Sequence, residues 1–267
     1  MPYETLREVV MAAPTYLGGQ RALLLQIAHP SVAAGVAEHS GFKTNPLPRA
    51  RYTGNLLQSL LWGDEDQGAA AVGHMKRRHT VVRGDRADGE AYSAEDPELQ
   101  LWVWATLVDT SKEVFERFAR AFQPEEKESF YQDWRDMGLR MGLPDSVLPA
   151  TAPDFELYFQ SQLEHLEVSD HGRDLAKHIL YAHRGLPWVL QLRLFDQLRL
   201  MNIGMLPTHV QQGLGCAVDQ EETAKAEHNL VSWWRTFPVR LLATKLTGLA
   251  RAELSFRRFK RQVRSRL

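Results

Sequence analysis

Three groups of polar side chains in this 267-residue chain lie in otherwise apolar stretches, where they can do chemistry. The first is His79, which follows Val72 and Met75 at helical spacing, so that the three side chains share one face of a helix. An imidazole on such a face can ligate a metal through one nitrogen while a hydrogen bond orients the other. A core histidine bonded to the backbone or to a second side chain is the structural alternative.

The second group is Arg49 and Thr53, which are four residues apart and therefore neighbours on one helical face. Leucines at 56, 57 and 60 continue that face. A buried guanidinium needs an anion, and a carboxylate-bearing cofactor would supply one beside a small polar Thr53. Alternatively, Arg49 starts a helix and reaches water or an acidic residue.

The third group is Gln26 and His29, which come just before Pro30. Proline interrupts or kinks a helix and frees backbone acceptors one turn earlier, near Gln26. The small residues at 33–35 permit the close approach of a flat ligand or of another helix. We take Gln26 and His29 as candidates to line a ligand space, although helix packing alone also explains the small residues.

The elements that must position these groups are helical nearly throughout, and strand-like alternation is almost absent. Acidic residues at 64–66 and basic residues at 76–78 suit the two ends of one helix dipole. The stretch 81–92 contains two glycines and two aspartates and predicts a loop, and 142–153 predicts a long connection. We expect an all-α fold in which residues 1–267 form a single domain, with helices over 23–36 (interrupted at Pro30), 55–62, 64–78, 93–118, from 124, 154–166, 173–183, 187–201, 221–234 and after Pro238.

Composition excludes several classes of protein. The single cysteine, Cys216, rules out internal disulfides and argues against a cysteine-based metal site. A net charge of −1 gives no general attraction to nucleic acid. The usual motifs of dinucleotide-binding proteins, P-loop enzymes, α/β-hydrolases and zincins are missing.

The chain shows no targeting pattern. Its first residues do not form a signal peptide, and no apolar run approaches the ~20 residues of a membrane helix, so we expect a cytoplasmic protein without a transmembrane segment. Residues 251–267 carry seven basic side chains and one acidic. We interpret them as a solvated basic helix or tail; weak association with a membrane surface is the alternative.

Five short segments occur in an order and at a spacing that resemble one family: 19–30, 49–53, 79–84, 92–97 and 101–105. The chain is similar, over roughly residues 15–240, to the catalytic domain shared by the bacterial latex clearing proteins (rubber oxygenases) and the fungal oxygenase that cleaves the farnesyl side chain in mycophenolic acid biosynthesis.

The resemblance implies a globin-like helical core that encloses b-type haem. It implies that His79, in the pattern His-x-x-Val-Arg, is the proximal iron ligand, and that Arg49 and Thr53 lie at the haem pocket. Two features depart from the rubber oxygenases. Tyr52 stands where they have a lysine, and the export signal is missing, so extracellular rubber is not the expected substrate.

Together these observations predict a haem b-dependent oxygenase that uses dioxygen on an apolar small molecule of isoprenoid or unsaturated character. His79 would bind the iron, Arg49 and Thr53 would contact the cofactor, and Gln26 and His29 are further catalytic candidates. A haem-binding sensor or carrier without turnover is one alternative. A cofactor-free helical protein that binds a lipid or a partner is another.

Overall fold

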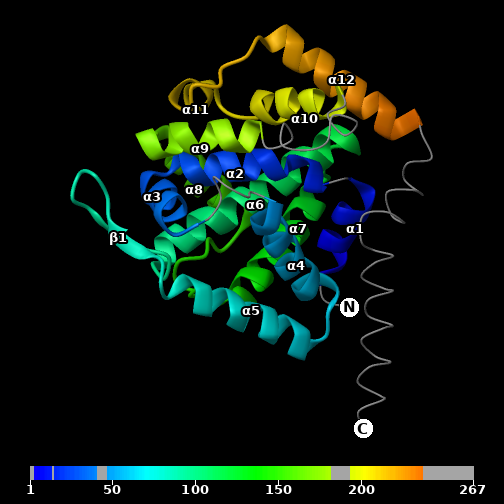
Figure 1. The fold of residues 1–267 in the computed structure, drawn as a ribbon. Coiled ribbons are helices and arrows are strands. Elements are labelled where there is room, and N and C mark those ends of the chain that lie inside the picture. The colour runs from blue at the N-terminus through cyan, green and yellow to red at the C-terminus, as the bar shows by residue number, and fades with distance from the viewer. Residues whose placement is uncertain (1–2, 14, 41–46, 182–192, 237–267) are drawn as a thin grey trace, which may run out of the picture.

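The computed structural model describes residues 3–13, 15–40, 47–181 and 193–236, and of residues 47–51, 193–194 and 235–236 it describes the backbone alone. Helices account for nearly all of this part of the chain (Figure 1). The first half contains α1 Glu4–Ala12, a 3₁₀ turn at Thr15–Gly18, α2 Gly19–Ala28, α3 Pro30–His39, α4 Leu47–Trp62 and α5 Glu65–His79. A hairpin of β1 Arg83–Asp85 and β2 Ala91–Ser93 precedes α6 Pro97–Phe118, α7 Pro124–Met141, α8 Ala152–Glu164, α9 Asp170–Leu180, α10 Arg193–Gly204, α11 Thr208–Gly213 and α12 Gln220–Thr236.

Local signals set the ends of the helices around the predicted site. His29 adopts an extended conformation between α2 and α3, and Pro30 begins α3, so the predicted interruption at Pro30 is confirmed. The Asp64 side chain accepts a hydrogen bond from the backbone N–H of Gln67 and caps α5. Asp96 caps α6 in the same way, immediately before a proline in the first turn. These short-range contacts fix where each helix starts and hence which residues face the interior.

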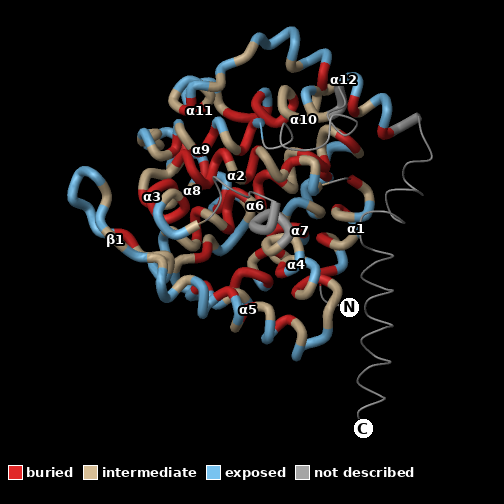
Figure 2. The backbone as a smooth tube through the Cα atoms, viewed as in Figure 1, coloured by how far each residue is buried: buried red, intermediate tan, exposed pale blue. Residues whose placement is uncertain are grey.

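The helix α6 runs through the middle of the molecule, and the tube in Figure 2 is mostly red where other helices cover it. Trp102 and Trp104 on this helix are each 1% exposed. Trp102 stacks on Phe159 of α8 at 5.7 Å, and Trp104 meets Tyr131 of α7 edge-on at 6.2 Å. Truncating a buried aromatic of this size costs about 3–5 kcal/mol, so these rings hold α6, α7 and α8 together.

The remaining helices pack in pairs around this centre. Pairs in contact are α2 with α6 and α9, α3 with α9, α4 with α5, and α10 with α12. In Figure 1, α10 and α12 lie at the top, α4 and α5 at the bottom, and α2 and α6 between them. The described part of the chain is thus mostly helical, as predicted, and its buried apolar residues form one hydrophobic cluster. No described helix combines the length and the apolarity that crossing a bilayer requires.

The prediction of a loop over 81–92 was wrong. This stretch forms the antiparallel hairpin β1–β2, in which Gly84 pairs with Tyr92 and Gly89 takes a φ of +87° in the connecting turn. Each strand has three residues, which is too short to show the alternation of polar and apolar residues that indicates a strand. Their position depends on a distant contact instead: Tyr92 is 5% exposed, and its hydroxyl donates to Glu38 on α3 at 2.6 Å.

Several boundaries also differ from the expectation. Ser93 belongs to β2, and α6 starts only at Pro97. The helices α1 and α11 were not predicted, whereas α4 includes both the helical face expected from Arg49 and Thr53 and the leucine stretch expected at 55–62. The connection at 142–151 joins α7 to α8, as expected, and Gly142 ends α7 with a φ of +98°. The start of the helix predicted at Pro187, the stretch after Pro238 and the basic segment 251–267 lie outside the described residues.

Candidate functional site

A cavity of about 580 Å³ lies between α2, α3, α4, α5, α6 and the hairpin. Its volume falls in the range of about 300–1,000 Å³ that is typical of small-molecule and cofactor sites. Most of its described wall is apolar, with contributions such as Leu56 from α4, Met75 from α5 and Leu107 from α6. The chemistry of the site therefore depends on the polar side chains that interrupt this apolar wall.

Three of the predicted site residues line this one cavity: Gln26, Thr53 and His79. They come from three different helices. Gln26 lies on α2, Thr53 lies on α4, and His79 is the last residue of α5. The packing of α4 against α5 brings Thr53 and His79 to the same space. The structure therefore joins residues that are more than fifty positions apart in the sequence.

The Gln26 amide is fixed by a hydrogen bond. Gln26 is 4% exposed, and its Nε2 donates to Oγ1 of Thr106 at 3.1 Å. The Thr106 hydroxyl in turn donates to the Val103 carbonyl at 2.7 Å, so it presents a lone pair to Gln26. A buried amide held in this way can offer a polar group to a ligand in one orientation.

His29 lies apart from this group, because it is not among the described residues that line the cavity. Its ring centroid is 6.4 Å from that of Trp102, and its Nδ1 is buried without a hydrogen-bond partner in the described chain. Burial lowers the pKa of His29, and the nearby Arg86 guanidinium lowers it further. The imidazole is thereby kept neutral, and the geometry gives no support to a catalytic role.

Arg49 lies in the first turn of α4, one turn before Thr53. Its side chain is outside the described residues. The backbone placement agrees with the shared helical face that the spacing predicts.

Tyr52 and Arg78 are among the polar residues of the cavity wall that were not candidates. The Arg78 Cζ lies 5.2 Å from the centroid of the Tyr52 ring, and the His74 ring lies 5.4 Å from it. Burial raises the pKa of the Tyr52 hydroxyl, against the opposing effect of the Arg78 and Arg77 charges. In the sequence, the basic residues at 76–78 were interpreted as favourable charges at the C-terminal end of a helix. For that reason Arg78 was not considered as a residue of the cavity.

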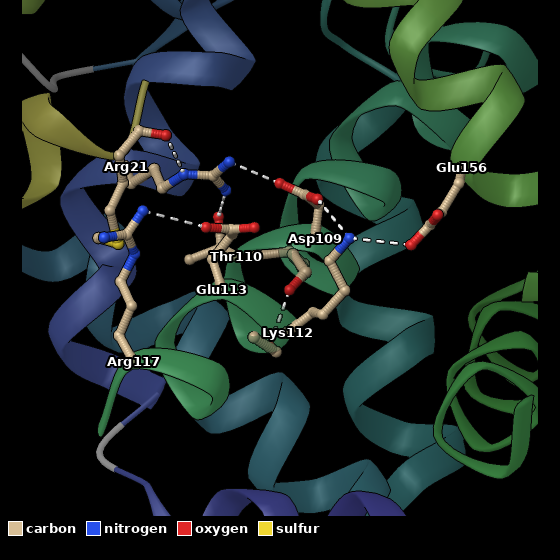
Figure 3. Close-up of polar contacts among 10 residues, drawn as sticks. Arg21, Asp109, Thr110, Lys112, Glu113, Arg117 and Glu156 are labelled. Atoms are coloured by element: carbon tan, nitrogen blue, oxygen red, sulfur yellow. Dashed lines mark hydrogen bonds and ion pairs between the residues drawn. The ribbon is translucent and has the colours of Figure 1, made fainter. Parts of the chain in front are cut away.

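A buried polar network that sequence reasoning also missed lies outside the cavity wall (Figure 3). The Arg21 guanidinium on α2 contacts the Asp109 carboxylate at 2.6 Å and donates to Oγ1 of Thr110 at 2.8 Å. Lys112 bridges Asp109 and Glu156 at 3.6 and 3.1 Å. The signal that could have revealed it was an arginine in the apolar run 19–28, which must find an anion when it is buried.

The chain is similar to known proteins. The model of the family "ER-bound oxygenase mpaB/B'/Rubber oxygenase, catalytic domain" matches residues 7–238. An uncharacterized protein of Mycobacterium bovis and one of Mycobacterium tuberculosis are each 29% identical over 173 residues, which cover 63% of this chain and 68% of each relative. No solved structure matches the chain. Because the family model spans most of its length, this chain belongs to the family of ER-bound oxygenase mpaB and rubber oxygenase catalytic domains.

Proposed function

We propose that this protein is a haem b-dependent oxygenase that adds oxygen from dioxygen to an apolar small molecule of isoprenoid or unsaturated character. One observation carries the proposal: His79 shares a largely apolar cavity with Thr53 and Gln26. Membership of an oxygenase family supports the reaction class. A globin-like arrangement of the helices around the cofactor is part of the proposal.

The residues present fit a haem. A haem iron needs one imidazole from the protein, and His79 is in the cavity wall. The cavity of about 580 Å³ has the size of a cofactor site, and its wall is largely apolar. Within the described chain no three His, Cys, Asp or Glu residues gather as a metal site, so a multidentate protein-bound ion has less support than a single imidazole on a haem.

The proposal gives distinct roles to the cavity residues and to Arg49, whose side chain lies outside the described residues. His79 would hold the iron, and Arg49 would pair with a propionate. When bound, the haem supplies the iron chemistry that activates dioxygen. Gln26, held by Thr106, and Thr53 offer polar groups that hydrogen bond to an oxygen atom of a ligand. Leu56, Leu107 and their neighbours bind the apolar substrate and keep bulk water out.

The test is an absorption spectrum and a pyridine haemochrome assay on the purified protein. We expect a Soret band in the wild type and its loss or strong reduction in His79→Ala. His228→Ala is the control, because His228 is exposed on α12 and is not in the described cavity wall. Unchanged haem content in His79→Ala would contradict the ligand assignment.

The apolar wall of the cavity favours a second candidate function, the binding of a lipid without a cofactor. Protein that shows no Soret band even after haem is supplied, but that binds a hydrocarbon probe, would favour it. A haem protein whose spectrum responds to gases but that oxidises no alkene would instead be a sensor or carrier.

A further inference from the structure

The charge of the cavity wall is unbalanced. The described residues that line it include no Asp or Glu, and Arg78 is the one Lys or Arg among them. A cation in such a wall attracts an anion from the contents of the cavity, because the described part of the wall supplies none. The positive charge of Arg78 therefore indicates a ligand that carries a negative charge.

The side chain of Arg78 lies against an aromatic ring and forms no ion pair with the described residues. Its guanidinium lies over the face of Tyr52, 5.2 Å from the ring centroid, and within the described chain it meets no carboxylate. A cation–π contact leaves the N–H groups at the edge of the guanidinium plane free to donate. Tyr52 comes from α4 and Arg78 from α5, so the packing of these two helices creates the arrangement.

The surroundings of Tyr52 add an independent observation. The charges that act on Tyr52 come from Arg78 and Arg77, both positive. Its hydroxyl is buried and has no hydrogen-bond partner in the described part of the chain. A buried hydroxyl without a partner is unfavourable, and a ligand oxygen or an ordered water beside the ring would satisfy it.

We propose that Arg78, positioned by the Tyr52 ring, binds a carboxylate of the molecule that occupies this cavity. The ligand is then amphipathic, with an apolar body against the leucine and valine walls and an anionic end at Arg78, which is exposed at the edge of the cavity. The carboxylate has two possible sources, a propionate of the haem or an acid group of the substrate. The first source rests on the proposed function, and the second does not.

The experiment compares acids with their esters. Binding of haem and of haem dimethyl ester is titrated by absorbance, and binding of hexadecanoate and of methyl hexadecanoate by calorimetry, on wild type and Arg78→Gln. Loss of a charge-assisted hydrogen bond should weaken binding of the acid about tenfold and leave the ester unchanged. Arg77→Gln is the matched control, since it removes the same charge from the adjacent, exposed residue that does not line the cavity; we expect a change below about twofold.

Two variants at Tyr52 separate a positioning role from general stability. Tyr52→Leu removes the ring and should reproduce part of the Arg78→Gln effect on the acid. Tyr52→Phe keeps the ring face and should therefore retain most of the preference of the wild type for the acid over the ester. Thermal melting of each variant shows whether the fold is intact, and Arg78, being exposed, tests the proposal even if a Tyr52 variant unfolds.

Each outcome decides between the proposals. A selective loss with haem assigns the subsite to a propionate, and a selective loss with hexadecanoate assigns it to a substrate acid. Equal losses for acid and ester in both arms, or equal effects of Arg77→Gln and Arg78→Gln, overturn the inference. Wild-type protein that binds hexadecanoate but no haem refutes the proposed cofactor and leaves the carboxylate subsite to the second arm. Wild-type protein that binds none of the four probes refutes both.

Discussion

The guanidinium of Arg21 lies 2.6 Å from the carboxylate of Asp109, and only 4% and 7% of these side chains are exposed. This pair joins α2 to the central α6, and Arg21 also donates to the Met205 carbonyl after α10 at 3.0 Å. Further along the same two helices, Gln26 meets Thr106. The buried ion pair thus joins the two helices that place Gln26 and Leu107 in the cavity wall.

Breaking this pair from one side should be costly. We expect Arg21→Met to lower the free energy of unfolding by about 3–5 kcal/mol, because it leaves the Asp109 carboxylate buried with Lys112 as its remaining cation. The double variant Arg21→Met/Asp109→Leu should lose less unfolding free energy than the two single variants lose together, since neither partner of the pair is left as an unpaired charge. Urea denaturation measures each value. As a control, Lys225→Met removes an exposed pair with Glu221 and should cost less than about 1 kcal/mol. A similarly small loss in Arg21→Met would show that the pair does not stabilise the fold.

The hydrogen bond between Gln26 and Thr106 gives a second prediction. Thr106→Val keeps the shape of a fully buried side chain but removes the acceptor of the Gln26 amide. Stability should fall by about 1–3 kcal/mol, because a buried N–H loses its partner. Combining it with Gln26→Leu should recover part of that loss, as a double-mutant cycle would report. Additive losses would mean that the two side chains do not interact.

The neutral His29 gives a pH dependence. Burial lowers its pKa below the usual value of 6.5, so in the unfolded chain the imidazole takes up a proton at a higher pH than in the folded protein. The contribution of the neutral His29 to the free energy of unfolding is therefore fully present above pH 6.5. It is lost as the pH falls from 6.5 through the pKa of His29 in the folded protein. His29→Gln should flatten the slope of unfolding free energy against pH below 6.5. An equal slope in the variant would assign the proton uptake to other groups.

Helix positions followed from the sequence where a local contact sets them. Asp64 caps α5 through a hydrogen bond from the backbone N–H three residues later, and a signal of that kind is visible in a linear sequence. The similar cap at Asp96 was missed, because the helix was expected to start at Ser93. The hairpin depends instead on the contact of Tyr92 with Glu38, 54 positions earlier. The six-residue α11 is shorter than two helical turns, too short to establish a period.

The same distinction applies to the candidate site. His79 was predicted from its place on an apolar helical face, Thr53 from its spacing to Arg49, and Gln26 from its position one turn before Pro30. Arg78 was missed because cations at the end of a helix already have a local explanation. Arg21 and Asp109 are 88 positions apart, so only the packing of α2 on α6 shows that they pair. The family resemblance was confirmed, whereas the roles of the individual residues remain predictions.

Filling the cavity provides a test of its function that does not depend on any polar group. Leu107 on α6 lines the cavity, and Leu107→Trp would place an indole in space that the ligand needs. We expect binding of both haem and hexadecanoate to be lost or strongly reduced, with a stability change of no more than about 1–3 kcal/mol, since the added bulk enters open space and not a packed core. Leu157→Trp on α8 is the matched control, because Leu157 is 73% exposed and does not line the cavity. Absorbance titration and thermal melting of both variants measure these effects. Wild-type affinity in a folded Leu107→Trp protein would place the ligand somewhere other than this cavity.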